Sequence, residues 1–255
     1  MDLALHTQRL RPEFGSFVAV DGIDLEVPRG SLYGFVGPNG AGKSTTIKCL
    51  TGLLAPTSGS IELLGLDPLK EPVAVKRQVG VVPEDLALFE QLTASETLAF
   101  VGQVHGLPPA TITKRSAELL ALMDLTSASG QLVADYSHGM RKKTSLAAAL
   151  LPAPKLLFLD EPFEGVDAIA SRQIKDLLLE YVKRGGTVFL TSHILEVVER
   201  LCDHIGVIHK GRLVAQGPTG ALRSAVTGGE TLEAMFLRLV GATEGAAAHL
   251  DWLSG

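Results

Sequence analysis

The stretch GPNGAGKST, residues 37–45, most constrains what this chain can fold into. It fits the phosphate-binding loop pattern G-x-x-x-x-G-K-[ST], and the apolar run 32–36 in front of it is typical of a buried strand. Residues 45–50 contain no helix breaker, so we expect a helix whose N-terminal N–H groups point at one anion. A chance match in a chain of this length has odds of about one in a hundred. The stretch therefore predicts binding of a nucleoside triphosphate.

The loop residues have distinct expected roles. Lys43 reaches the outer phosphates as a point charge, and the Ser44 hydroxyl ligates the Mg²⁺ that bridges those phosphates. The alternative, an ordinary glycine turn before a helix, is disfavoured by the strand in front and the helix behind. The residues expected to bind the nucleotide here are Gly37, Pro38, Asn39, Gly40, Ala41, Gly42, Lys43, Ser44 and Thr45.

The composition indicates a soluble chain. With 255 residues, 46% of them hydrophobic, the chain can form one large domain with a substantial core. The net charge of −5 gives no electrostatic footprint for nucleic acid, and we expect no nucleic-acid partner. Asp2, His6 and Arg9 argue against a signal peptide, and there is no run of about 18 apolar residues to span a bilayer. We therefore expect a cytosolic protein, with Cys49 and Cys202 as buried reduced thiols.

The pattern of turns and apolar runs predicts a mixed α/β chain. Residues 3–36 alternate apolar and polar side chains and predict an antiparallel β layer. From residue 92 to 151 the pattern becomes helical, beginning with the capping box TASE at 93–96. This stretch is either more core of the same domain or a separate lobe. Because strand-type sequence lies on both sides of it, we favour an inserted helical lobe at about 88–151.

Two further strands are expected to end in reactive side chains. The apolar run 156–159 ends at Asp160 and Glu161, and the run 187–190 leads to His193. Ligands of parallel α/β sheets sit beyond the carboxyl ends of the strands. Asp160 is the expected partner of Mg²⁺, and Glu161 the expected general base that polarises a water. His193 is expected to contact the γ-phosphate, and the alternative is an ordinary residue at a helix start. For Asp160 and Glu161 the alternative is a pair of carboxylates at a solvated strand end.

The rest of the chain supplies three more expectations. Ser137 is expected to cap a helix whose first turns carry Arg141, Lys142 and Lys143, either as a solvated basic face or beside an anionic partner. A hairpin is expected at 207–215. A capping box at 227–230 predicts a helix to residue 240, followed by a weakly patterned tail.

Together these motifs resemble the ATP-binding subunit of an ABC transporter. GPNGAGKST is similar to the Walker A motif of that family, LLFLDEP to its Walker B motif, EGVD at 164–167 to its D-loop and His193 to its switch histidine. YSHGM at 136–140 takes the place of the signature LSGGQ. Ser137 and Gly139 match it, whereas His138 and Met140 depart from it, as in exporters whose nucleotide subunit is a separate chain.

The resemblance assigns two more site residues. Glu84 falls at the glutamine-loop position, so a contact with Mg²⁺ or with a water would be made by a carboxylate instead of an amide. Phe14 takes the place of the base-stacking tyrosine, a role that the bare sequence does not separate from that of a core phenylalanine. The implied fold is α/β, a P-loop NTPase of ABC type. It has a parallel-sheet RecA-like core, an antiparallel β lobe and the inserted helical lobe within residues 1–240, followed by the tail 241–255.

The family also implies a partner and an activity. Two copies form a head-to-tail homodimer, with each ATP held between the P-loop of one copy and Ser137 and Gly139 of the other. The cations near Ser137 would then lie beside ATP bound to the partner. Hydrolysis drives transport, with export favoured, through separate integral membrane permease subunits that hold the chain at the cytoplasmic face of the membrane. The alternatives are a non-transport ABC protein acting on DNA or ribosomes and a nucleotide-gated module without turnover.

Overall fold

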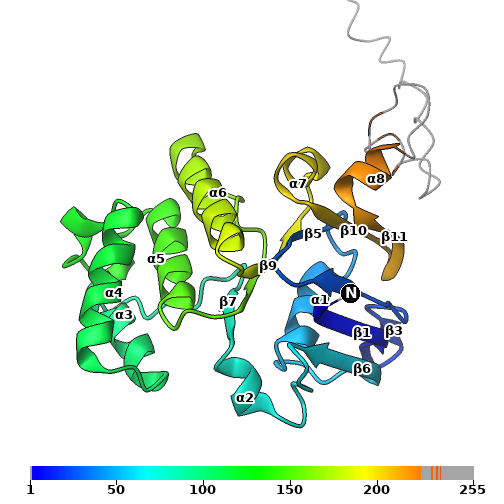
Figure 1. Ribbon diagram of the computed structural model, residues 1–255, viewed down its shortest axis with the longest axis horizontal. Coiled ribbons are helices and arrows are strands. Elements are labelled where there is room, and N and C mark those ends of the chain that lie inside the picture. Colours follow the sequence, from blue (N-terminus) through cyan, green and yellow to red (C-terminus); the bar gives the residue numbers. More distant parts are fainter. Residues whose placement is uncertain (1, 225–230, 232–233, 235, 237–255) are drawn as a thin grey trace, which may run out of the picture.

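A six-stranded, mostly parallel sheet forms the centre of the computed structural model, which describes residues 2–224, 231, 234 and 236 (Figure 1). The strands lie in the order β11-β10-β5-β9-β8-β7, and only the β10–β11 pair is antiparallel. Residues of β8 and β9 are buried on both faces, as expected for central parallel strands. The strands are β5 (Leu32–Val36), β7 (Val79–Val82), β8 (Leu156–Leu159), β9 (Thr187–Ser192), β10 (His204–His209) and β11 (Arg212–Pro218).

A second, antiparallel sheet packs beside it with the order β4-β1-β6 (Figure 1). It consists of β1 (Leu3–Arg11), β4 (Glu26–Pro28) and β6 (Ser58–Leu63), and a small hairpin joins β2 (Glu13–Phe14) to β3 (Phe17–Val18). The expected antiparallel layer over residues 3–36 is therefore wrong at its end. Residues 32–36 lie between β10 and β9 in the parallel sheet, because all five residues are buried and need cover on both faces.

In the described part of the chain, side-chain caps open the helices that begin at Ala94, His138 and Ala168. Thr93 and Glu96 form the expected capping box: the Glu96 N–H donates to Thr93 Oγ1 (3.1 Å) and the Thr93 N–H to Glu96 Oε2 (2.8 Å). The helices are α1 (Lys43–Leu50), α2 (Pro72–Lys76), α3 (Ala94–Val104), α4 (Pro109–Leu122), α5 (His138–Leu150), α6 (Ala168–Lys183), α7 (Leu195–Leu201) and α8 (Thr219–Ser224), with 3₁₀ turns at Thr126–Ala128 and Val133–Asp135.

Alternate residues of the central strands supply two apolar clusters, one on each face of the sheet. Leu156 and Phe158 belong to one cluster, and Leu157 and Leu159 to the other. Helices α3, α4 and α5, drawn in green in Figure 1, pack on one another and share the second cluster. The helical segment is thus joined to the sheet by continuous apolar packing, and its limits at 88 and 151 stay a prediction.

The β10–β11 hairpin and α8 are the last elements of the described residues. The expected hairpin is confirmed, and its turn residues Lys210 and Gly211 both have positive φ (46° and 76°). The expected helix at 227–240 and the tail 241–255 lie outside the described residues, apart from three positions within the helix. Cys49 and Cys202 are buried and free, as expected. Within the described part of the chain, no helix has both the length and the hydropathy to cross a bilayer.

Candidate nucleotide site

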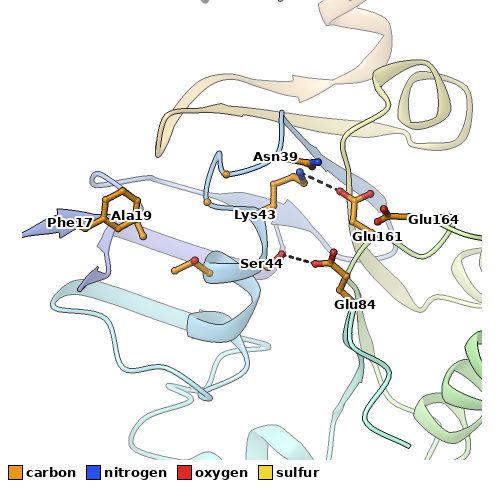
Figure 2. A pocket seen from close by; sticks show the side chains of 11 residues that line it. Phe17, Ala19, Asn39, Lys43, Ser44, Glu84, Glu161 and Glu164 are labelled. Carbon is orange, nitrogen blue, oxygen red and sulfur yellow. Dashed lines mark hydrogen bonds and ion pairs between the residues drawn. The ribbon is translucent and has the colours of Figure 1, made fainter. Parts of the chain in front are cut away.

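Four neighbouring strands carry the predicted site residues past their carboxyl ends. β5 leads into the phosphate-binding loop, β9 into His193, β8 into Asp160 and Glu161, and β7 into Pro83 and Glu84. A cavity of about 330 Å³ lies where the segments that follow β5, β8 and β7 meet the β2–β3 hairpin (Figure 2). It is lined by Phe17, Ala19, Asn39, Gly40, Gly42, Lys43, Ser44, Thr45, Glu84, Glu161 and Glu164.

The loop conformation requires glycine at two of its positions. Gly42 has φ 109°, and a Cβ there would lie 2.7 Å from the carbonyl oxygen of Ala19. A Cβ on Gly37 would lie 2.2 Å from the carbonyl oxygen of Ile208. With both glycines in place, α1 begins at Lys43, two residues earlier than expected, and its N-terminus faces the cavity. Gly37 and Pro38 lie on the other side of the loop, where they line a second cavity with His193.

The Lys43 ammonium is already paired inside the chain. Its side chain is only 6% exposed, and Nζ donates to the carbonyl oxygens of Gly37 (2.8 Å) and Pro38 (3.3 Å). Nζ also lies 3.2 Å from Glu161 Oε1, as the dashed line in Figure 2 shows. A buried lysine needs an anionic or strongly polar partner, and Glu161 supplies the anion here.

Glu161 joins three elements of the site. Its Oε2 lies 3.0 Å from His193 Nδ1 and accepts from the His193 N–H (3.3 Å). Its Oε1 contacts Lys43 and has no hydrogen bond of good geometry within the described residues. The structure therefore brings the two predicted catalytic residues together and leaves one carboxylate oxygen as an acceptor for a further donor such as a water.

Thr191 connects the two acidic residues at the end of β8. Its hydroxyl donates to Asp160 Oδ1 (2.5 Å) and accepts from the Glu161 N–H (2.9 Å). Sequence reasoning missed this residue. The available signal was a hydroxyl in a strand that is buried at all six positions, where each polar atom needs a partner.

The oxygen donors near Ser44 fit a magnesium ion. Ser44 Oγ donates to Glu84 Oε2 over 3.5 Å across the cavity (Figure 2). Asp160 is buried, accepts a hydrogen bond from the Thr191 hydroxyl and is not among the described residues that line the cavity. A hydroxyl and two carboxylates are the hard oxygen ligands that Mg²⁺ prefers.

The hairpin places a different aromatic ring on the cavity from the expected one. Phe17 lines the cavity, whereas Phe14 is not among the described residues that line it. The two are partners across the β2–β3 pair, and both are exposed (51% for Phe14 and 63% for Phe17). Phe17 carried no motif in the sequence, and its placement depends on the turn of the hairpin.

Two predicted ATP contacts lie away from this cavity. Ser137 caps α5 by accepting from the Met140 N–H (3.2 Å), and its side chain is exposed. Gly139 follows in the first turn of the same helix. In the described part of the chain, neither residue lines the cavity that contains Lys43.

The cations that follow Ser137 have partners in their own chain. Arg141 donates to the carbonyl oxygens of Val133 and Ala134, and Lys142 donates to those of Glu161 and Glu164. Burial lowers the pKa of the Lys142 ammonium. Backbone carbonyls of the same chain therefore bind Arg141 and Lys142, and their position beside a partner's ATP stays a prediction.

Comparison with known proteins agrees with this geometry. The profile of the family described as "ABC transporter" matches residues 20–164. The daunorubicin/doxorubicin resistance ATP-binding protein DrrA of Streptomyces peucetius is 41% identical over 223 residues, which cover 88% of this chain and 68% of that protein. The bacitracin transport ATP-binding protein BcrA of Bacillus licheniformis is 38% identical over 226 residues, 88% of this chain and 72% of that protein.

A solved structure described as the ATP-binding subunit of an ABC transporter superposes with a TM-score of 0.86 at 32% identity, covering 93% of this chain and 99% of that one. The chain belongs to the ABC transporter family. Within it, the chain is an ATP-binding, ATP-hydrolysing subunit that powers transport. The predictions of family, of a P-loop NTPase fold and of a transport ATPase are confirmed.

Proposed function

We propose that two copies of this chain hold two ATP molecules head to tail and that hydrolysis powers export through separate membrane subunits. One observation carries the dimer: Lys43 and Glu161 lie in the cavity, whereas Ser137 and Gly139 are presented elsewhere, at the start of α5. Each chain thus supplies one P-loop half and one Ser137 half of a nucleotide site. A second copy of the chain brings the missing half to each site. The relatives named for drug resistance and for Nod factor export support the outward direction.

The charges of the cavity suggest how hydrolysis proceeds. The phosphates of ATP replace Glu161 as the anionic partner of Lys43. The Glu161 carboxylate then accepts the proton of the attacking water as general base, and His193 keeps it oriented through Nδ1. Ser44, Asp160 and Glu84 would hold Mg²⁺, which would neutralise charge on the phosphates.

An apolar groove between the sheet and the helical segment is the proposed docking site for a membrane subunit. The groove has a volume of about 690 Å³ and is bordered by α2, β7 and α3. Large exposed side chains gather in it, and the rings of Phe89 and Phe100 meet edge to face at 5.3 Å. Such a surface fits the apolar face of a short helix from a permease at the cytoplasmic side of the membrane. The exposed apolar side chains are Leu53, Val73, Phe89, Phe100 and Val104.

One loop connects this groove to the nucleotide cavity. Pro83 and Leu86 line the groove, and Glu84 between them lines the cavity and contacts Ser44. A displacement of this loop therefore changes both surfaces. The proposed path by which ATP hydrolysis moves the permease runs through this loop.

The test is Glu161→Gln in the purified chain. We expect ATP binding to persist, steady-state hydrolysis to be lost and an ATP-dependent dimer to accumulate, as measured by light scattering after gel filtration. The matched control adds Ser137→Ala, which leaves the P-loop intact and should abolish the dimer but not ATP binding. Normal hydrolysis by Glu161→Gln would exclude the base role, and a monomer at saturating ATP would exclude the sandwich.

A further inference from the structure

Lys142 is a buried cation in the middle of the catalytic region. It lies on α5, five residues after Ser137, and its side chain is only 3% exposed. Nζ donates to the carbonyl oxygens of Glu161 (2.5 Å) and Glu164 (3.0 Å). The Glu164 N–H also donates to the Glu161 carbonyl oxygen (3.2 Å), which closes residues 161–164 into a turn. One ammonium group therefore holds both ends of the turn that begins with the proposed base.

The backbone conformation of this turn needs stabilising contacts. Glu161 has φ 47°, a left-handed conformation that is unfavourable for a residue with a Cβ. Its side chain must nevertheless point between Lys43 and His193, so the backbone conformation decides where the carboxylate lies. A bond from a charged donor to the carbonyl of Glu161 itself is one of the contacts that fix this conformation.

If only the stability of the fold mattered, a lysine would be an unfavourable residue at this position. Burial lowers the pKa of Lys142, although the carboxylates of Glu164, Glu161, Glu84 and Asp160 act in the opposite direction. The first turns of a helix also disfavour a cation. A methionine of similar length would fill the same space without either cost. What the ammonium adds is its pair of bonds to the turn.

We propose that Lys142 is a positioning residue for ATP hydrolysis, which fixes the Glu161 turn to the helix that begins at Ser137. The inference rests on the proposed role of Glu161 as general base. In the proposed dimer, Ser137 meets the ATP bound by the partner, whereas Glu161 serves the ATP bound by its own chain. Lys142 therefore links occupancy of one site to the position of the base in the other.

The first test compares Lys142→Met with Lys175→Met. The ammonium of this control lysine lies 5.2 Å from the centroid of the Phe163 ring, so it contacts the same turn through an aromatic side chain. A small misplacement of a catalytic group greatly lowers the rate of the chemical step. We therefore expect Lys142→Met to lower kcat about 100-fold and to change KM by less than about threefold. Lys175→Met should behave as the parent chain. Equal kcat values for the two variants, measured on the folded fraction, would overturn the proposal.

A second test separates positioning from general loss of structure. In single-turnover assays, Lys142→Met is combined with Glu161→Gln, in which there is no base left to position. We expect no further loss of the residual rate in the double variant, because both changes remove the same function. An additional loss as large as that in the parent background would show a structural role and overturn the proposal. Full hydrolysis by Glu161→Gln alone would instead refute the base role, so the two failures are distinguishable.

Discussion

Replacing Phe17 by alanine tests which aromatic ring stacks on the base of ATP. Phe17 lines the cavity that contains Lys43, whereas Phe14, its partner across the hairpin, is the residue that family resemblance selects. Both rings are exposed, so their removal leaves the core of the chain intact. We expect Phe17→Ala to weaken ATP binding and Phe14→Ala to change it little.

The size of the effect follows from the exposed area of the ring. At 63% exposure, a side chain of about 200 Å² leaves about 125 Å² free, and roughly half of this is one ring face. With an equal area removed from the base, about 120 Å² is buried, worth at most about 3 kcal/mol at 25 cal/mol per Å². Stacking measured by alanine substitution is worth about 1–3 kcal/mol per base. The Kd for ATP should therefore rise roughly tenfold to hundredfold.

The assay is isothermal titration calorimetry with two ligands. ATP has a base and inorganic triphosphate does not, so Phe17→Ala should weaken only ATP binding. Lys43→Ala is the matched control, because loss of the phosphate contact should weaken both ligands. Wild-type affinity of Phe17→Ala for ATP would refute the reasoning, and a loss in Phe14→Ala alone would restore the assignment made from the family resemblance.

Two more substitutions test the metal site and the groove. Glu84→Gln removes a carboxylate next to Ser44, so the Mg²⁺ concentration for half-maximal hydrolysis should rise about tenfold; an unchanged Mg²⁺ titration would remove Glu84 from the metal site. Phe89→Asp places a charge in the apolar groove and should weaken association with co-expressed membrane subunits by about 2 kcal/mol or more, while hydrolysis by the isolated chain stays normal. Undiminished co-purification would exclude the groove as the docking surface.

Sequence reasoning predicted the parts of the site that lie next to a strand end. Lys43, Glu161 and His193 each follow a strand of the parallel sheet, and neighbouring carboxyl ends must meet at one edge. Local chemistry was equally informative at Thr93 and Ser137, because a cap depends on three or four residues of sequence. Both kinds of prediction need little knowledge of distant contacts.

The residues that sequence reasoning missed depend on packing between distant segments. Lys142 looks like one of three surface cations, and only the approach of α5 to residues 161–164 shows that its ammonium is buried. Thr191 likewise acquires its role from the pairing of β8 with β9. The preference of Phe17 over Phe14 in the cavity depends on how a short hairpin lies against the P-loop, which no local pattern specifies.

In the proposed mechanism, the contact between Lys43 and Glu161 joins ATP binding and release of the proposed base in one event. A buried lysine that lacked an anion would be unstable, and before ATP arrives the Glu161 carboxylate satisfies this need. The Oε1 atom that contacts Lys43 is also the carboxylate oxygen that has no hydrogen bond within the described residues. Phosphates that take over Lys43 therefore also leave this oxygen free to accept a hydrogen bond from the attacking water. The chain thus keeps the proposed base paired with Lys43 until the substrate replaces it.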